Sequence, residues 1–132
     1  MQRESWLAAA PESASIARAI VREAARSQGL DNTAVWDLML ATTEAVTNAV
    51  LHGQACAERS AIRLWIQASE DGLFVEVCDC GRFLRPSEPR PLDSPGGRGI
   101  PLMSAVTDDF ELTPEAGGTR VRFGKRIVAA AA

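Results

Sequence analysis

The amino-acid sequence predicts one domain that contains both helices and strands. Up to about residue 53 the apolar residues recur every three or four positions, as they do along helices with one buried side. From Ile62 onward they alternate with polar residues, which is the pattern of half-buried strands. The length of 132 residues is close to that of a single domain, and 46% hydrophobic and 23% charged residues are ordinary for a globular chain.

The N-terminal part is predicted to hold a short edge strand followed by two helices. Residues 6–9 form the candidate strand, and the first helix opens at Pro11 and ends at Gly29, because a helix often ends in a left-handed residue. Asp31 or Asn32 is expected to cap a second helix that reaches about Gly53. The apolar side of this second helix is expected to consist of Val35, Leu38, Thr42, Val46 and Ala49.

The C-terminal part is predicted to be mostly strand. Residues 62–69 alternate strictly, residues 70–72 form a turn, and residues 73–77 return as the antiparallel partner of a hairpin. Two more strands are expected at residues 108–112 and 118–127, the last one opened by a turn at residues 117–119. Residues 128–132 are expected to be a disordered tail.

Composition and charge exclude several classes of protein. The 14 basic and 17 acidic residues give a net charge of −3, so we expect no direct nucleic-acid binding. No apolar run approaches the roughly 18 residues of a membrane span, and the N-terminus is too polar for a secretory signal. The three cysteines argue against a disulfide framework and for a cytoplasmic location. Lys125 is the only lysine, which argues against a phosphate loop built around a lysine.

Three polar residues follow one another along the second predicted helix at four-residue spacing. Glu44, Asn48 and His52 form a stripe, and Glu44 lies about 180° around the helix axis from Val35. The stripe is therefore expected to point away from the apolar side. It is either a solvated helix face or a face turned toward a ligand, and the alanines and valines around it favour the ligand.

A long segment without periodicity separates the strand at residues 73–77 from the next predicted helix. It carries four of the seven prolines and ends in a glycine-rich run before Ile100 and Pro101, where a short helix begins. Glycines at a helix start allow backbone N–H groups to approach an anion, and the helix dipole adds attraction. Residues 82–99 are therefore predicted to form a lid over a binding site; the alternative is a plain surface linker.

Four short segments, taken in order, resemble the ATP-binding boxes of the GHKL superfamily. This superfamily includes histidine-kinase catalytic domains, type II topoisomerases and the large heat-shock chaperones. The segments are Glu44 to Gly53, Asp79-Cys-Gly81, Gly97-Arg-Gly99 and Gly118-Thr119. The likeness covers about residues 11–123, and it is greatest to the small bacterial anti-sigma-factor serine/threonine kinases.

The resemblance implies both a fold and an activity. The fold would be an α+β two-layer sandwich, in which a mixed, largely antiparallel sheet carries helices on one face and ATP lies between the helices and the lid. The activity would be that of an ATP-dependent protein kinase that phosphorylates an anti-anti-sigma protein and sequesters a sigma factor. A homodimer is a further implication of the likeness.

The resemblance also implies roles for individual residues. Asn48 would bind the Mg²⁺ that bridges the phosphates, because an amide oxygen is a hard ligand of the kind that this ion prefers. Glu44, one turn earlier, would act as general base for the attacking hydroxyl. The other expected binding positions are Asp79, Gly81 and Thr119 around the adenine, and Gly97, Arg98 and Gly99 around the phosphates.

One departure from the family pattern and two other functions stay open. The second box usually reads Asp-x-Gly-x-Gly, but its fifth position here is Phe83, which removes backbone freedom and adds bulk beside the nucleotide. Phe83 favours a second function, that of a non-catalytic module that regulates a partner by binding. A third is a zinc protein, with the candidate ligands His52, Cys56, Cys78 and Cys80.

Overall fold

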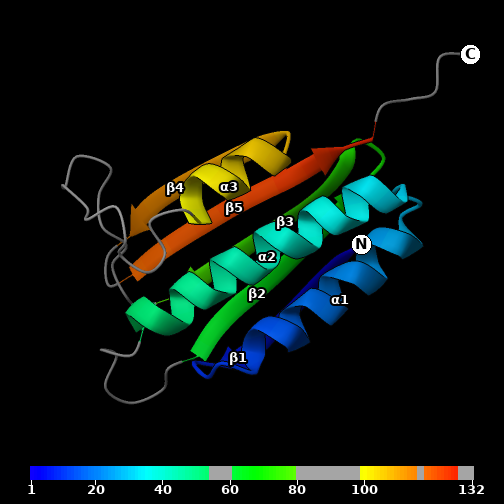
Figure 1. Cartoon of the computed structure of the whole chain (residues 1–132). Helices are drawn as coiled ribbons and strands as arrows, with labels where there is room; N and C mark the ends of the chain where they lie inside the picture. The colour runs from blue at the N-terminus through cyan, green and yellow to red at the C-terminus, as the bar shows by residue number, and fades with distance from the viewer. Residues whose placement is uncertain (54–60, 80–98, 116–117, 128–132) are drawn as a thin grey trace, which may run out of the picture.

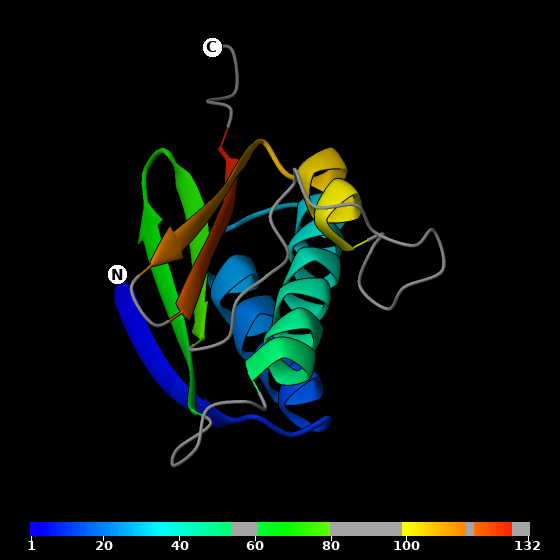
Figure 2. The same cartoon turned by 90° about the vertical axis from the view of Figure 1, so that its left-hand side faces the viewer.

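The computed structural model describes residues 1–53, 61–79, 99–115 and 118–127, and within them a five-stranded sheet carries three helices on one face (Figures 1 and 2). In chain order the elements are β1 (Gln2–Ala8), α1 (Ser13–Ser27), α2 (Asn32–Gly53), β2 (Ala61–Ser69), β3 (Gly72–Asp79), α3 (Gly99–Val106), β4 (Asp109–Glu115) and β5 (Gly118–Arg126). The strand order is β1-β2-β3-β5-β4. All four pairings between the described strands are antiparallel, so the predicted sandwich is confirmed.

The hydrophobic core lies between the sheet and the helices. Inward-facing residues of β2, β3 and β5 alternate with outward-facing ones, as the period-2 pattern predicted. Helix α2 lies over the middle of the sheet, with α1 on one side of it and α3 on the other (Figure 1). The largest buried side chains include Leu38, Ile62, Leu64, Ile66, Leu73, Val75, Val77, Met103, Val121 and Phe123.

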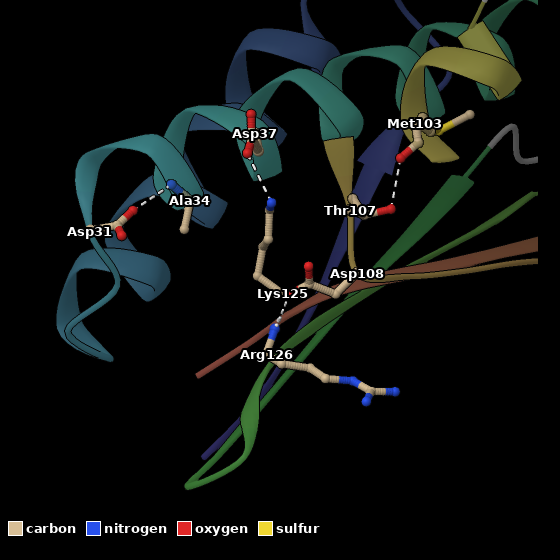
Figure 3. Close-up of polar contacts among 8 residues, drawn as sticks. All are labelled: Asp31, Ala34, Asp37, Met103, Thr107, Asp108, Lys125 and Arg126. Carbon is tan, nitrogen blue, oxygen red and sulfur yellow. Dashed lines mark hydrogen bonds and ion pairs between the residues drawn. The ribbon is translucent and has the colours of Figure 1, made fainter. Parts of the chain in front are cut away.

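The predicted boundary between the first two helices and the predicted end of the second helix are confirmed, whereas α1 begins at Ser13 and not at Pro11. Gly29 has a φ of 83°, in the left-handed region, and the chain turns there from α1 toward α2. Of the two candidate caps, Asp31 is the one that acts, because its Oδ1 accepts a hydrogen bond of 2.8 Å from the Ala34 N–H (Figure 3). Helix α2 ends at Gly53, as expected.

Three strands, β1, β3 and β4, are clearly longer than the sequence predicted, and β3 covers Gly72–Asp79 instead of residues 73–77. Strand β1 begins at Gln2 instead of residue 6, because it pairs with β2 from Gln2↔Gln67 to Ala8↔Ala61. Strand β4 continues to Glu115 and includes Pro114, which an edge strand tolerates because one side of its backbone needs no partner. Hydrogen bonding to a neighbouring strand, and not the apolar content of the segment, sets these bounds.

Polar pairs fasten the edges of the sheet. Arg126 donates two hydrogen bonds of 2.9 and 2.8 Å to Asp109, and these bonds hold the pKa of the Asp109 carboxyl below its ordinary value. On the opposite edge, Arg63 donates to Glu4 at 2.8 Å, which raises the pKa of the arginine.

No helix in the described part of the chain is long and apolar enough to cross a membrane.

An ion pair joins α2 to β5 near the N-terminal end of α2. Lys125 Nζ lies 2.9 Å from Asp37 Oδ2, and the two side chains are only 17% and 25% exposed (Figure 3). Close by, Asp108 Oδ2 accepts a hydrogen bond of 2.7 Å from the Arg126 N–H, at the start of β4. The only lysine of the chain therefore connects the helical layer to the sheet.

We expect Asp37→Asn to lower the free energy of unfolding by about 1 kcal/mol, because it leaves the half-buried Lys125 ammonium without its charged partner. Urea denaturation measures the change. The matched control is Glu23→Gln, which removes the exposed, 3.7 Å pair with Arg3 and should leave stability unchanged. Equal effects of the two substitutions would contradict the role given to Asp37.

Candidate functional site

Four chain segments that are distant in sequence lie at one end of the molecule. The C-terminal end of α2, the N-terminal end of α3, the last residues of β3 and the first residues of β5 are all at this end (Figure 1). Of the predicted site residues, Glu44 and Asn48 lie on α2, Asp79 on β3 and Thr119 on β5. The fold thus places the C-terminal half of α2, which carries Asn48, toward the same end of the molecule as Asp79 and Thr119, which follow it by 31 and 71 positions in sequence.

Asn48 has the most informative surroundings in this group. Its side chain is 2% exposed, and neither Nδ2 nor Oδ1 has a hydrogen-bond partner among the described residues. A buried polar group without a partner costs about 1–3 kcal/mol of stability, so native proteins retain one where a ligand or ion completes it. The amide oxygen fits Mg²⁺, which prefers oxygen ligands and keeps several waters.

The burial of Asn48 corrects the prediction that the polar stripe points away from the apolar side. Helix α2 is covered by the sheet, by α1 and by α3, so it is buried over much more than one side. Ala41 and Ala45 are fully buried on the flank that leads to Asn48. Glu44, one turn before Asn48, is half-buried. His52 belongs to α2, but its side chain lies outside the described residues.

Asp79 and Thr119 are direct partners in the register of β3 and β5. Both face the helical layer, because they continue the inward-facing rows that contain Val77 and Val121. Thr119 is buried, and both carboxylate oxygens of Asp79 are shielded from solvent. A carboxylate beside a hydroxyl can accept a hydrogen bond from an amino group and order it against the sheet.

The remaining predictions concern residues that the structure does not describe or describes only in part. Gly99 is the first residue of α3, so its backbone belongs to a helix N-terminus. Gly81, Gly97, Arg98, Phe83 and the rest of the predicted lid before Gly99 lie outside the described residues, as does the predicted tail at residues 128–132. The zinc hypothesis stays a prediction, since Cys56 and Cys80 are also outside. Within the described ranges, no group of three or more His, Cys, Asp or Glu residues could hold a metal ion.

Thr42 is a second buried polar residue that the sequence analysis assigned only to the apolar side of α2. Its side chain is fully buried, and Oγ1 has no hydrogen-bond partner in the described part of the chain. The apolar pattern correctly predicted that Thr42 is buried, since it lies in line with Leu38 and Val46. No sequence signal could have shown that its hydroxyl lacks a partner.

Comparison with known proteins adds to this geometry. The family described as "Histidine kinase-like ATPase domain" matches residues 7–125. The serine-protein kinase RsbW of Oceanobacillus iheyensis is 28% identical over an alignment of 126 residues, which covers 86% of this chain and 80% of that one. An anti-sigma F factor of Clostridium beijerinckii is 31% identical over 100 residues, covering 69% of this chain and 70% of its own.

One solved structure has the same fold. The crystal structure of the RsbU and RsbW domains of Rv1364c from Mycobacterium tuberculosis superposes with a TM-score of 0.76 at 24% identity. The match covers 96% of this chain and 32% of that longer chain. At this identity the likeness shows the fold and nothing beyond it.

We expect Asn48→Leu to raise the free energy of unfolding of the ligand-free protein by about 1–2 kcal/mol, because it removes a buried amide without a partner and keeps the volume. Thr42→Val should raise it by about 1 kcal/mol for the same reason. Urea denaturation without nucleotide measures both. A loss of stability in Asn48→Leu would show that the amide is hydrogen-bonded in the ligand-free protein.

Proposed function

We propose, since this chain belongs to the family of histidine kinase-like ATPase domains, that it is an ATP-dependent protein serine/threonine kinase that acts as an anti-sigma factor. Membership in this family implies that the chain binds ATP. The single observation that carries the proposal is the buried Asn48 amide, which has no partner among the described residues and lies one turn after the half-buried Glu44. The relatives called RsbW and anti-sigma F factor support it.

Asn48 and Glu44 have separate roles in this proposal. The Asn48 Oδ1 atom would be a ligand of Mg²⁺, and this ion, when bound, offsets the charge of the phosphates. The Glu44 carboxylate accepts the proton of a serine or threonine hydroxyl as the hydroxyl oxygen bonds to the γ-phosphorus. The bond from that phosphorus to its bridging oxygen breaks, and ADP leaves. A half-buried position suits Glu44, because the protein substrate must reach it from outside.

The other site residues bind the nucleotide. Asp79 accepts a hydrogen bond from the adenine amino group, and the buried Thr119 lines the same pocket from the neighbouring strand. Gly81 allows the base to approach the backbone. Gly97 and Gly99 surround the phosphates, and Arg98 offsets their charge.

The proposed partners follow from the family resemblance and from the name of one relative. The resemblance implies that the substrate is an anti-anti-sigma protein with an acceptor serine or threonine, and the name anti-sigma F factor supports a sigma factor as the protein that is held. We place the phosphorylation of the substrate and the binding of the sigma factor in the cytoplasm. A homodimer stays a prediction of the family likeness.

A second candidate function is regulation by binding alone, without phosphoryl transfer. The observation in its favour is Phe83, which stands where the family pattern has glycine. A chain of this kind would hold its partner whether or not Glu44 is intact. The two functions therefore differ in their dependence on one carboxylate.

We expect Asn48→Ala to abolish Mg²⁺-dependent ATP binding, because it removes the amide oxygen that would coordinate the ion. Isothermal titration calorimetry of the full chain with Mg·ATP measures the change. Thr47→Ala is the matched control, since Thr47 is the exposed neighbour on the same helix and should leave the affinity unchanged. If Asn48→Ala binds Mg·ATP as tightly as the unaltered chain does, Asn48 is not part of the binding site.

We expect Glu44→Gln to slow phosphoryl transfer about 10²- to 10⁴-fold, the usual contribution of a general base, while ATP affinity changes little. Transfer of radiolabelled phosphate from ATP to candidate anti-anti-sigma proteins measures the rate. If the unaltered chain binds ATP and transfers phosphate to none of them, the kinase proposal fails. If it then still holds its partner, the second function is the correct one.

A further inference from the structure

The outer side of helix α2 is unusually apolar for a helix surface that faces solvent. Trp36 is 67% exposed, Leu40 is 39% exposed and Leu51 is 46% exposed. In the 22 residues of α2, the only Asp, Glu, Lys or Arg residues are Asp37 and Glu44, and Asp37 is paired with Lys125. Helices at a protein surface normally turn charged residues outward, so exposed apolar residues along one side indicate a binding surface.

The neighbouring helix α1 supplies the charge that α2 lacks. Arg18, Arg22 and Arg26 follow one another at four-residue spacing and form a row along α1. Arg18 donates hydrogen bonds to Ser15 at 3.3 Å and to Thr43 of α2 at 3.4 Å. Arg22 and Arg26 are exposed, and neither has an ion-pair partner within the described ranges.

The contact between Arg18 and Thr43 sets the alignment of the two helices. Helices α1 and α2 run in opposite directions side by side (Figure 1), and both rise by about 1.5 Å per residue. Four residues from this contact, Arg22 is therefore level with Met39, the residue before Leu40. Four residues further, Arg26 is level with Val35, the residue before Trp36. Two exposed guanidinium groups of α1 thus lie at about the level of two exposed apolar side chains of α2.

The acidic groups near this surface do not cancel its charge. On α1, Glu23 is directed to Arg3 of β1 at 3.7 Å. On α2, Asp37 is directed to Lys125. Glu44 lies one turn beyond Leu40, toward the nucleotide end, and limits the positive surface to the N-terminal half of α2. Trp36 lies twelve residues before Asn48, about 18 Å along the helix.

We propose that Arg22, Arg26, Trp36 and Leu40 form a docking surface for an acidic amphipathic helix of a partner protein. A third helix can pack across two antiparallel helices, and its apolar side chains would then pack on Trp36 and Leu40. Its carboxylates would pair with the two guanidinium groups. The surface is separate from the nucleotide site, so this binding does not depend on the proposed kinase activity.

The test uses the full chain and two synthetic peptides. The first is a fluorescein-labelled helix of 18 residues with leucines along one side and glutamates elsewhere; the second has lysine in place of every glutamate. Fluorescence anisotropy at low ionic strength should show binding of the acidic peptide only. Added salt should weaken the binding, since exposed charges are screened within about 10 Å at 0.1 M.

Two variants and two matched controls locate the binding. The double variant R22E/R26E and the single variant Trp36→Ser should each weaken binding of the acidic peptide about tenfold or more. Arg3→Glu makes one such charge reversal on β1, and Ile16→Ser removes an exposed apolar side chain elsewhere on α1. These controls should bind like the unaltered chain.

The proposal is overturned if the chain does not bind the acidic peptide, if the lysine peptide binds equally well, or if the variants bind like the controls. Calorimetry with Mg·ATP separates this outcome from failure of the proposed function, because R22E/R26E and Trp36→Ser should keep the ATP affinity of the unaltered chain. If the unaltered chain does not bind ATP, the kinase proposal fails, and the proposal of the docking surface is unaffected.

Discussion

The burial of α2 between the sheet, α1 and α3 is the constraint on which the rest of the structure depends. Val35, Leu38 and Val46 are almost fully buried along this helix, and each buried aliphatic side chain contributes about 1.5–3 kcal/mol. This apolar contribution offsets the cost of enclosing the Asn48 amide without a partner. If only one side of the helix were buried, Asn48 would be exposed to water, and water molecules would supply the hydrogen bonds of its amide.

The two ends of α2 therefore differ in function. At its C-terminal end, Asn48 lies near the ends of β3 and β5, where Asp79 and Thr119 are opposed. Toward its N-terminal end, Asp37 is joined to β5 by the pair with Lys125. The stabilising contact and the candidate site are thus on the same helix but separated along it. A substitution at one end can change stability without altering the chemistry at the other.

Local patterns predicted the local features of this fold well. The strict alternation at residues 62–69 and the turn after it correctly indicated the β2–β3 hairpin, because register and turn act between residues that are close in sequence. Gly29 and Asp31 correctly marked the ends of α1 and α2, for the same reason. The full length of β1 could not be predicted, since it depends on pairing with a strand about 60 residues away.

The sequence by itself determined the element types, the caps, the hairpin and the common helix of Glu44 and Asn48, because helix and strand periodicity operates over a few residues. Only the tertiary structure showed that Asn48 is buried, that Asp79 and Thr119 are neighbours, and that Trp36 is exposed on the helix that packs against α1. The physical reason is that burial and proximity depend on how distant elements pack. A helical pattern shows which residues share a side, but not how many sides other elements cover.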